Sequence, residues 1–359
     1  MPDLIALGWT DSLAGIFRPH ADAGLVPGRV SLEHNHVYRV MAADREWLAE
    51  TAGRIKYLAS GREELPAVGD WVGLRTDAAG GRAVIRVILP RRSQFSRKVA
   101  GRETLEQVLA ANIDTVFLVA SLQQPIKQRS LERYVMLARP SGARPVIVLN
   151  KADLAGNIGQ ALIDAAEAAP GVPIHVISAK TGAGLGALEA YLGVGQTTAL
   201  LGPSGAGKSS LVNALAGRAT QTIGDVRDWD LRGRHTSVHR ELIPLDAGGL
   251  LIDTPGLREL QLWDAPEDAA LDETFGDIAE LAGACRFRDC QHDREPGCAV
   301  KAAVDAGRLA PDRHAGFLKL QSERAALSRR QDERALLENK RQAKIANKAL
   351  TKLQQKRER

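Results

Sequence analysis

The spacing of hydrophobic and polar residues changes twice along the chain. Up to about residue 100, short alternating runs such as Val37–Val40, Trp71–Leu74 and Val84–Leu89 are separated by Gly, Pro and Asp. Alternation with a period of two is typical of half-buried strands. Several short strands bounded by turn residues predict a small β-barrel.

From about Leu105 onward, apolar β-branched runs alternate with helical stretches. The predicted strands are Val116–Val119, Val146–Leu149, Ile174–Ile177, Thr198–Leu201 and Leu250–Ile252. The predicted helices between them are Leu131–Ala138, Gly159–Ala169, Leu185–Leu192 and Ser209–Ala216. Apolar strands buried on both faces predict a mostly parallel sheet with helices on either side.

Beyond about Trp263 the pattern becomes helical, and no Gly or Pro follows Gly316. The last stretch, Leu320–Arg359, has 12 Lys and Arg against 5 Asp and Glu, which favours a polyanionic partner or a solvated helix face. We therefore predict an α/β multidomain protein with a β-rich domain at 1–103, an α/β domain at 104–262 and a helical domain at 263–359.

Composition narrows the class of protein. Hydrophobic residues make up 44% of the chain and charged residues 25%, and the formal net charge is +5, which is typical of a soluble globular protein. No apolar run approaches the roughly 20 residues that span a bilayer. The first residues lack a basic segment and carry Asp3 and Asp11, unlike a signal peptide. We expect a cytoplasmic protein with no membrane contact.

A phosphate-binding motif lies between a predicted strand and a predicted helix. Its residues and the serine that follows are Gly202, Pro203, Ser204, Gly205, Ala206, Gly207, Lys208, Ser209 and Ser210. The glycines allow backbone N–H groups to surround phosphate oxygens, and the helix N-terminus favours negative charge. Lys208 is predicted to reach the β- and γ-phosphates, and the Ser209 hydroxyl is predicted to ligate Mg²⁺.

A second phosphate-site motif, Asp253-Thr-Pro-Gly256, follows the predicted strand Leu250–Ile252. A carboxylate at this strand end can hold Mg²⁺ through a water, and the Gly256 N–H can meet a γ-phosphate. By itself the same tetrapeptide is also an ordinary turn. The phosphate-binding motif in the same domain favours the functional interpretation.

Two further motifs predict a guanine site. The first is Asn150, Lys151, Ala152 and Asp153, and the second is Ser178, Ala179 and Lys180. Guanine presents adjacent N1–H and N2–H donors that a carboxylate accepts, and adenine lacks this pair, so Asp153 is predicted to select GTP over ATP. Asn150 and Lys151 are expected to tie loops together and cover the base, and the Ala179 N–H is expected to meet the guanine O6.

The order of these motifs is circularly permuted, because the base-binding pair precedes the phosphate-binding motif. In a GTPase with the usual motif order, the chain would begin and end at this point; here a short link at Gly193–Thr197 joins those two ends.

The basic segment 224–240 is the candidate first switch. Thr236 is predicted to contact Mg²⁺ and the γ-phosphate, with Ser237 as the alternative. Leu257 cannot orient a water, so slow intrinsic hydrolysis is expected, with His235 as a candidate substitute.

All three cysteines of the chain lie in one short window. Together with a histidine they form a Cys-x4-Cys-x-His-x5-Cys pattern: Cys285, Cys290, His292 and Cys298. Three thiolates and one imidazole suit a closed tetrahedral Zn²⁺ site. Buried free thiols are the alternative. One structural Zn²⁺ would stabilise a small module that has little core of its own.

Together these motifs resemble the ribosome small subunit-dependent GTPase family. The resemblance rests on Asn150–Asp153, Gly202–Ser210, Gly233–Thr236, Asp253–Gly256 and the Cys/His window, and on Val68-Gly-Asp70 in the β-rich start. It implies an N-terminal OB-fold β-barrel that binds RNA, a circularly permuted P-loop GTPase domain and a C-terminal zinc-binding domain. After Thr236 this chain reads Ser-Val-His, where relatives usually have a longer threonine run, which leaves the switch threonine open.

The resemblance also implies an activity: binding of the small (30S) ribosomal subunit and its 16S rRNA, action late in subunit maturation, and GTP hydrolysis stimulated by the subunit. Two other functions stay open. An RNA-binding protein could hold GTP for structure and barely hydrolyse it, and an ATP-using P-loop enzyme is disfavoured by Asp153. In the absence of coiled-coil heptads, a monomer is expected.

Overall fold

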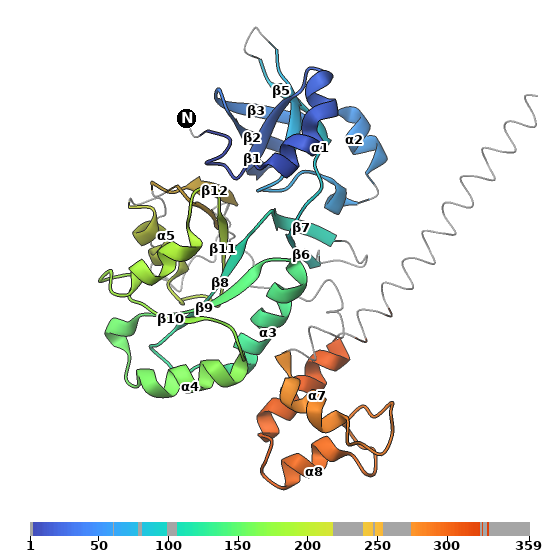
Figure 1. Ribbon diagram of the computed structural model, residues 1–359, viewed down its shortest axis with the longest axis vertical. Coiled ribbons are helices and arrows are strands. Elements are labelled where there is room, and N and C mark those ends of the chain that lie inside the picture. Colours follow the sequence, from blue (N-terminus) through green and yellow to red (C-terminus); the bar gives the residue numbers. More distant parts are fainter. Residues whose placement is uncertain are drawn as a thin grey trace, which may run out of the picture. The chain divides into compact units, whose positions relative to one another are not determined.

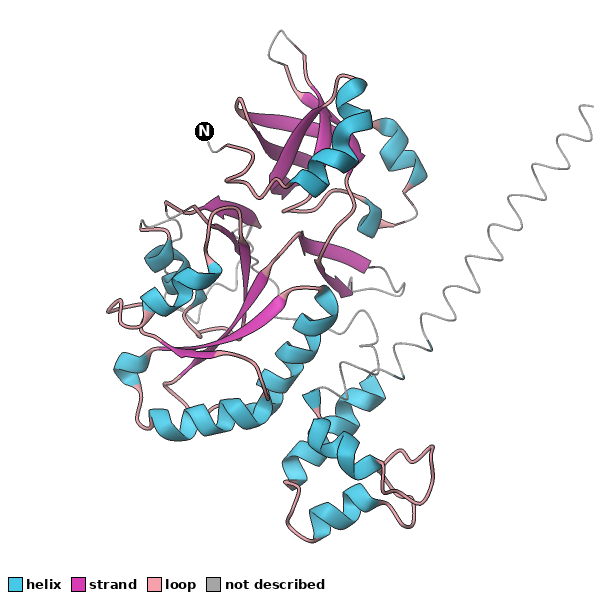
Figure 2. Ribbon diagram, in the orientation of Figure 1, coloured by secondary structure: helices cyan, strands magenta, loops and turns pink. Residues whose placement is uncertain are grey.

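The structure is a computed structural model that describes residues 3–59, 61–77, 81–98, 106–217, 240–246, 248–253, 274–323, 325 and 329. Described residues from Asp3 to Arg97 and from Glu106 to Gly276 form one compact unit, and those from Asp277 onward form a second. Figure 1 labels the elements, and Figure 2 shows that strands belong to the first unit while the second is helical.

The first element is a helix that the alternating pattern did not predict, α1 (Asp11–Asp22). The Thr10 hydroxyl caps it by accepting a hydrogen bond from the Leu13 N–H at 3.3 Å. Leu13 and Phe17, one helical turn apart, are its buried residues. Gly15 and Pro19 lie inside the helix and weaken its sequence signal, so tertiary packing of the buried pair outweighs local propensity.

The predicted small barrel is confirmed. Its strands are β1 (Val26–His34), β2 (Val37–Ala42), β3 (Glu46–Thr51), β4 (Trp71–Arg75) and β5 (Ala83–Ile88). They pair in the order β1-β2-β3-β5-β4, and β4 returns to pair with β1, which closes the barrel. All these pairs are antiparallel except β3 with β5. This is the five-stranded architecture of an OB-fold.

Alternate residues of the barrel strands point inward and form its core. In β2, for example, Tyr38, Val40 and Ala42 are buried, whereas Arg39 between them is exposed. The helix α2 (Gly53–Leu58) and the short 3₁₀ helix η1 (Arg62–Glu64) connect β3 to β4. The alternation read from the sequence is therefore the inside–outside alternation of a closed sheet.

The predicted mostly parallel sheet is also confirmed. Its strands are β8 (Thr115–Ser121), β9 (Arg144–Asn150), β10 (Ile174–Val176), β11 (Thr197–Leu201), β12 (Glu241–Pro244) and β13 (Leu250–Asp253). They lie in the order β10-β9-β8-β11-β13-β12, and only β12 is antiparallel to its neighbour β13. The chain thus builds one half of the sheet outward from β8 and then returns to the middle at β11.

Helices cover both faces of this sheet. Against one face pack α3 (Gln128–Ala138) and α4 (Ile158–Ala168), and against the other pack the 3₁₀ helix η4 (Leu185–Tyr191) and α5 (Lys208–Leu215). Alternate residues of β8 serve the two faces: Val116 and Leu118 join the α3 side, and Phe117 and Val119 join the α5 side. The helix predicted at Leu185–Leu192 is thus present, but in the tighter 3₁₀ form.

The barrel is joined to the α/β sheet by backbone pairing and by a buried arginine. Leu32 of β1 pairs with Glu241 of β12. The Arg29 side chain, 1% exposed, donates hydrogen bonds to the carbonyl oxygens of Leu7 at 2.5 Å, Gly69 at 3.2 Å and Asn112 at 2.9 Å. Burial lowers the pKa of Arg29 to about 10, so the guanidinium stays charged at neutral pH.

A two-stranded ribbon, β6 (Gln94–Lys98) with β7 (Glu106–Ala111), completes the strands of the described residues. The second unit contains α7 (Gly276–Ala282), α8 (Ala299–Asp305) and a helical stretch at 311–323. Most of the predicted long basic tail helix lies outside the described residues. No helix in the described part of the chain has the length and apolar character needed to cross a bilayer.

Candidate functional site: a nucleotide site and a metal centre

The predicted phosphate-binding motif forms the loop between β11 and α5. Gly202 has φ +150°, and a Cβ there would collide with the Val119 carbonyl oxygen of the neighbouring strand. Gly207 has φ +89° and provides no side-chain cap to α5, so the first-turn N–H groups keep their capacity for an anion. The loop geometry therefore depends on glycine at both of its ends.

Lys208 is the first residue of α5, and its side chain folds back over the loop. Its Nζ donates to the Gly202 carbonyl oxygen at 2.7 Å and to the Pro203 carbonyl oxygen at 2.8 Å. These bonds hold the ammonium group against the backbone of the loop whose N–H groups are predicted to surround phosphate.

Asn150, at the end of β9, links the predicted base site to the phosphate loop. Its Nδ2 donates to the carbonyl oxygens of Ala206 at 3.1 Å and Gly207 at 3.4 Å. Its Oδ1 accepts from the Lys151 N–H at 2.7 Å and the Ala179 N–H at 3.0 Å. One side chain that is 1% exposed therefore fixes three loops relative to one another.

Asp153 lies in a 3₁₀ turn, η3 (Ala152–Leu154), that follows β9. Its Oδ1 accepts a 2.6 Å hydrogen bond from the Ser178 hydroxyl, which in turn accepts from the Thr181 N–H at 3.2 Å. Lys151 adopts φ +67°, and its Nζ donates to Gln123 Oε1 at 2.7 Å. The two predicted base-binding motifs are thus brought together, with the carboxylate held by the second motif.

These residues open onto a cavity of about 650 Å³. Its walls include Asn150, Lys151, Asp153, Ala179, Lys180, Gly207 and Ser210, all predicted from the sequence. Four lining residues were missed: Leu154, Asn213, Ala214 and Gly217. Asn213 and Ala214 lie three and four residues after Ser210 on α5, the spacing of one helix face, and that periodicity was the signal available in the sequence.

Asp253 is the last residue of β13, which lies beside β11 with Ala199 opposite Ile252. The Asp253 carboxylate therefore lies at the same edge of the sheet as the phosphate loop, because both follow the carboxyl ends of parallel strands. An aspartate here and the Ser209 hydroxyl in the first turn of α5 are the hard oxygen donors that Mg²⁺ prefers. The predicted residues Thr236, His235 and Gly256 lie outside the described residues.

In the second unit, Cys285, Cys290, His292 and Cys298 converge, with all four ligand atoms within 4.8 Å of one another. The Sγ atoms of Cys285 and Cys298 are 4.0 Å apart, and each lies 3.5–3.6 Å from His292 Nδ1. Bond lengths of about 2.3 Å to sulfur and 2.0–2.1 Å to nitrogen give tetrahedral edges of about 3.8 Å and 3.5 Å. The separations among Cys285, His292 and Cys298 match these edges, and Cys290 lies close enough to be the fourth ligand.

Neighbouring groups hold this cluster in place. The His314 ring contacts the His292 carbonyl oxygen at 2.9 Å, and the Phe317 ring lies 5.9 Å from the His292 ring. Cys298 is also the N-cap of α8, so its sulfur accepts from the Lys301 N–H at 3.5 Å. Burial lowers the pKa of His292, which favours the neutral imidazole that a metal requires.

Comparison with known proteins agrees with this geometry. The model of the RsgA GTPase family matches residues 88–263. A small ribosomal subunit biogenesis GTPase RsgA of Opitutus terrae is 47% identical over 337 residues, which cover 92% of this chain and 92% of that protein. This chain belongs to the RsgA GTPase family. The corresponding RsgA protein of Streptomyces coelicolor is 42% identical and covers 95% of this chain and 92% of its own length.

Solved structures show that the permuted fold is shared. YjeQ from Thermotoga maritima superposes with a TM-score of 0.60 at 28% identity, covering 84% of this chain and 98% of that chain. YloQ, described as a circularly permuted GTPase, superposes with a TM-score of 0.57 at 25% identity, covering 85% and 96%. As a member of the RsgA GTPase family, the chain is a GTP hydrolase, and the family implies GTP and Mg²⁺.

Proposed function

We propose that this chain binds the small (30S) ribosomal subunit, acts in its late maturation, and hydrolyses GTP to GDP and phosphate at a rate that the subunit stimulates. Membership of the RsgA GTPase family and the names of its relatives from Opitutus terrae and Streptomyces coelicolor support the partner. The observation that carries the nucleotide assignment is the 2.6 Å bond that holds Asp153 to Ser178 beside the cavity.

The main predicted site residues have the following roles in this proposal. Asp153 accepts the guanine N1–H and N2–H donors, and the Ala179 N–H meets O6. Asn150 positions both by tying their loops to the phosphate loop. Lys208 and the backbone N–H groups of residues 202–209 hold the phosphates.

Mg²⁺ would be held by the Ser209 hydroxyl, with Asp253 through a water and Thr236 from the switch segment. The metal would neutralise charge on the β- and γ-phosphates. Gly256 would donate its N–H to the γ-phosphate, and His235 would orient the attacking water, because Leu257 cannot. Slow intrinsic turnover follows from that leucine.

Recognition of the subunit is assigned to the basic and barrel regions. We place an RNA-binding OB-fold domain at 1–103, the GTPase domain at 104–262 and a zinc-binding domain with a basic tail at 263–359. The OB-fold and the excess of Lys and Arg in the tail suit contacts with the phosphates of 16S rRNA. A monomer working on ribosomal subunits in the cytoplasm, without membrane contact, fits these assignments.

GTP turnover with and without purified small subunits, at two salt concentrations, tests the proposal. Strong stimulation that weakens at higher salt is expected, because phosphate contacts release counterions. A Lys208→Ala variant is the negative control for contaminating GTPases. Intact GTP binding without stimulation at either salt would instead favour a protein that holds GTP for structure while binding RNA, the alternative that Leu257 keeps open.

A further inference from the structure

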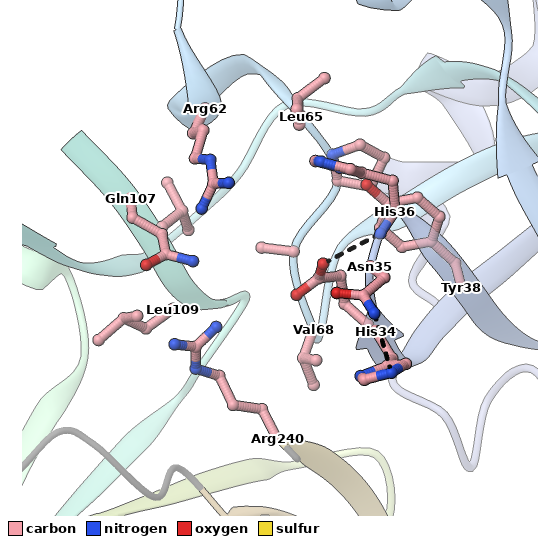
Figure 3. Close-up of a pocket in the computed structure, with 14 residues that line it drawn as sticks. His34, Asn35, His36, Tyr38, Arg62, Leu65, Val68, Gln107, Leu109 and Arg240 are labelled. Atoms are coloured by element: carbon pink, nitrogen blue, oxygen red, sulfur yellow. Dashed lines mark hydrogen bonds between the residues drawn. The ribbon is translucent and has the colours of Figure 1, made fainter. Parts of the chain in front are cut away.

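A polar hollow of about 300 Å³ lies apart from the nucleotide cavity, between the barrel and β7. Its volume is at the lower end of the roughly 300–1,000 Å³ typical of small-ligand sites. The turn between β1 and β2 forms one wall, and η1, β7 and Arg240 form the others. Figure 3 shows the side chains around this hollow.

The β1–β2 wall is a two-residue hairpin turn. Asn35 and His36 have φ of +49° and +63°, and His34 pairs with Val37 across the turn. Two consecutive positive φ values define the tight turn that matches the twist of the strands. His34 and His36 flank Asn35 in this turn, and both line the hollow.

Positive charge predominates in the hollow. Figure 3 shows the guanidinium groups of Arg62 and Arg240 entering it from opposite walls, with His34 and His36 on a third side. Glu33 is the one carboxylate among the described lining residues, and it accepts from the His36 N–H at 3.5 Å. Within the described part of the chain, Arg62 has no carboxylate partner.

We propose that this hollow binds a phosphate group, carried either by RNA or by a free anion. Guanidinium groups match phosphate oxygens with paired N–H donors. A tetrahedral phosphate can engage donors that converge from several directions, as Arg62, Arg240 and the two imidazoles do. A planar carboxylate, in contrast, would pair with only one guanidinium group at a time. The inference stands on this geometry and does not rest on the proposed action on ribosomal subunits.

The site would also connect two parts of the protein. Arg62 belongs to the barrel, whereas Arg240 directly precedes β12, the strand that pairs with β1 through Glu241 and Leu32. Residues 224–240 are the predicted first switch. A phosphate held between the two arginines would therefore link the barrel to the end of that segment.

The imidazoles of His34 and His36 provide a local readout. The chain has eight histidines. The NMR signals of the His34 and His36 imidazoles are assigned with the variants His34→Gln and His36→Gln, each of which removes one signal. Inorganic phosphate is titrated at fixed pH and ionic strength into protein saturated with GDP and Mg²⁺, so that the nucleotide site is occupied. Saturable shifts of both signals are expected. Arg62→Gln and Arg240→Gln should each weaken the apparent affinity about tenfold, the effect of losing one charge-assisted contact.

Two variants serve as controls. Arg82→Gln removes an exposed arginine that pairs with Glu50 outside the hollow, and it should titrate like the unmodified protein. Arg62→Lys keeps the charge but removes the planar fork, and it should bind more weakly than the unmodified protein. Melting temperatures establish that each variant is folded before its affinity is compared.

A short single-stranded oligoribonucleotide, titrated in the same way, separates the two sources. If it shifts the same histidines and competes with phosphate, the ligand is an RNA phosphodiester. If only inorganic phosphate does so, the ligand is a free anion. If neither probe produces saturable shifts, or if the Arg62→Gln and Arg240→Gln variants titrate like the unmodified protein, the proposal is wrong.

Discussion

Gly8 and Gly195 pack against one another so closely that neither position accommodates a side chain. A Cβ on Gly8 would lie 2.6 Å from the Gly195 carbonyl oxygen, and a Cβ on Gly195 would lie 2.7 Å from the Ile5 carbonyl oxygen. Gly195 belongs to the link between η4 and β11 that the permuted order requires, and its N–H donates to the Gly248 carbonyl oxygen at 3.1 Å. The N-terminal segment therefore packs directly onto that link.

Gly195→Ala is expected to destabilise the first unit. The substitution places an L side chain at φ +74°, which costs about 1–2 kcal/mol, and the clash with the Ile5 carbonyl oxygen adds about 1–3 kcal/mol. Gly171→Ala is the matched control, because Gly171 also has φ +74° but has no atom within 4 Å of its Cβ. Denaturant midpoints that fall equally for the two variants would show that the packing onto Gly8 contributes nothing.

Asp153→Asn should change base preference. The asparagine NH₂ faces the guanine donors, so we expect GTP affinity to fall by about a hundredfold or more while xanthosine nucleotides bind better. Competition against a fluorescent guanine nucleotide measures both effects. Unchanged GTP affinity would contradict the base-site assignment. Recovery of subunit-stimulated turnover with xanthosine triphosphate would also show that the activity belongs to this chain.

Asn150→Ala should weaken nucleotide binding, although the Asn150 side chain is not expected to contact the phosphates directly. The variant loses bonds to Ala206 and Gly207 and leaves the Ala179 N–H without its acceptor. We expect GDP affinity to fall about tenfold to a hundredfold. Asn157→Ala is the control: it removes the N-cap of α4, costs about 1 kcal/mol of stability and should leave GDP affinity unchanged. Equal losses of affinity in both variants would indicate a general effect of destabilisation.

Cys285→Ser should abolish zinc binding and unfold the second unit locally. The unmodified protein is expected to contain one Zn²⁺ per chain, because a closed site of this kind contributes about 10–16 kcal/mol of apparent binding free energy. Metal analysis and hydrogen exchange in α8 measure the loss. GDP binding should persist, because the nucleotide site lies wholly in the first unit. Arg294→Gln, at a side chain 92% exposed, should retain the metal.

An unmodified protein that is purified without zinc, and whose α8 amides are nevertheless protected from exchange, would contradict the assignment. In that case Cys285, Cys290 and Cys298 would be the buried free thiols that the sequence left as the alternative.

The sequence by itself predicted most of the residues that line the candidate nucleotide cavity, because each motif is short and follows an apolar strand. The reactive residues of the motifs Asn150–Asp153 and Gly202–Ser210 are contiguous with the strand or helix that positions them. The barrel and the parallel sheet followed from the same local periodicity. The helix α1 was missed because Gly15 and Pro19 suppress its local signal, whereas burial of Leu13 and Phe17 stabilises it in the fold.

Only the tertiary structure decided which distant residues meet. The hollow between Arg62 and Arg240, the contact of Gly8 with Gly195 and the burial of Arg29 each join segments that are far apart in the chain. Arg240 and Gly195 lie in segments that the sequence singled out, but nothing in the local pattern around an arginine or a glycine reveals its distant partner. Sites formed by contiguous residues can be predicted from the sequence. Contacts between distant segments depend on how the barrel and the sheet pack.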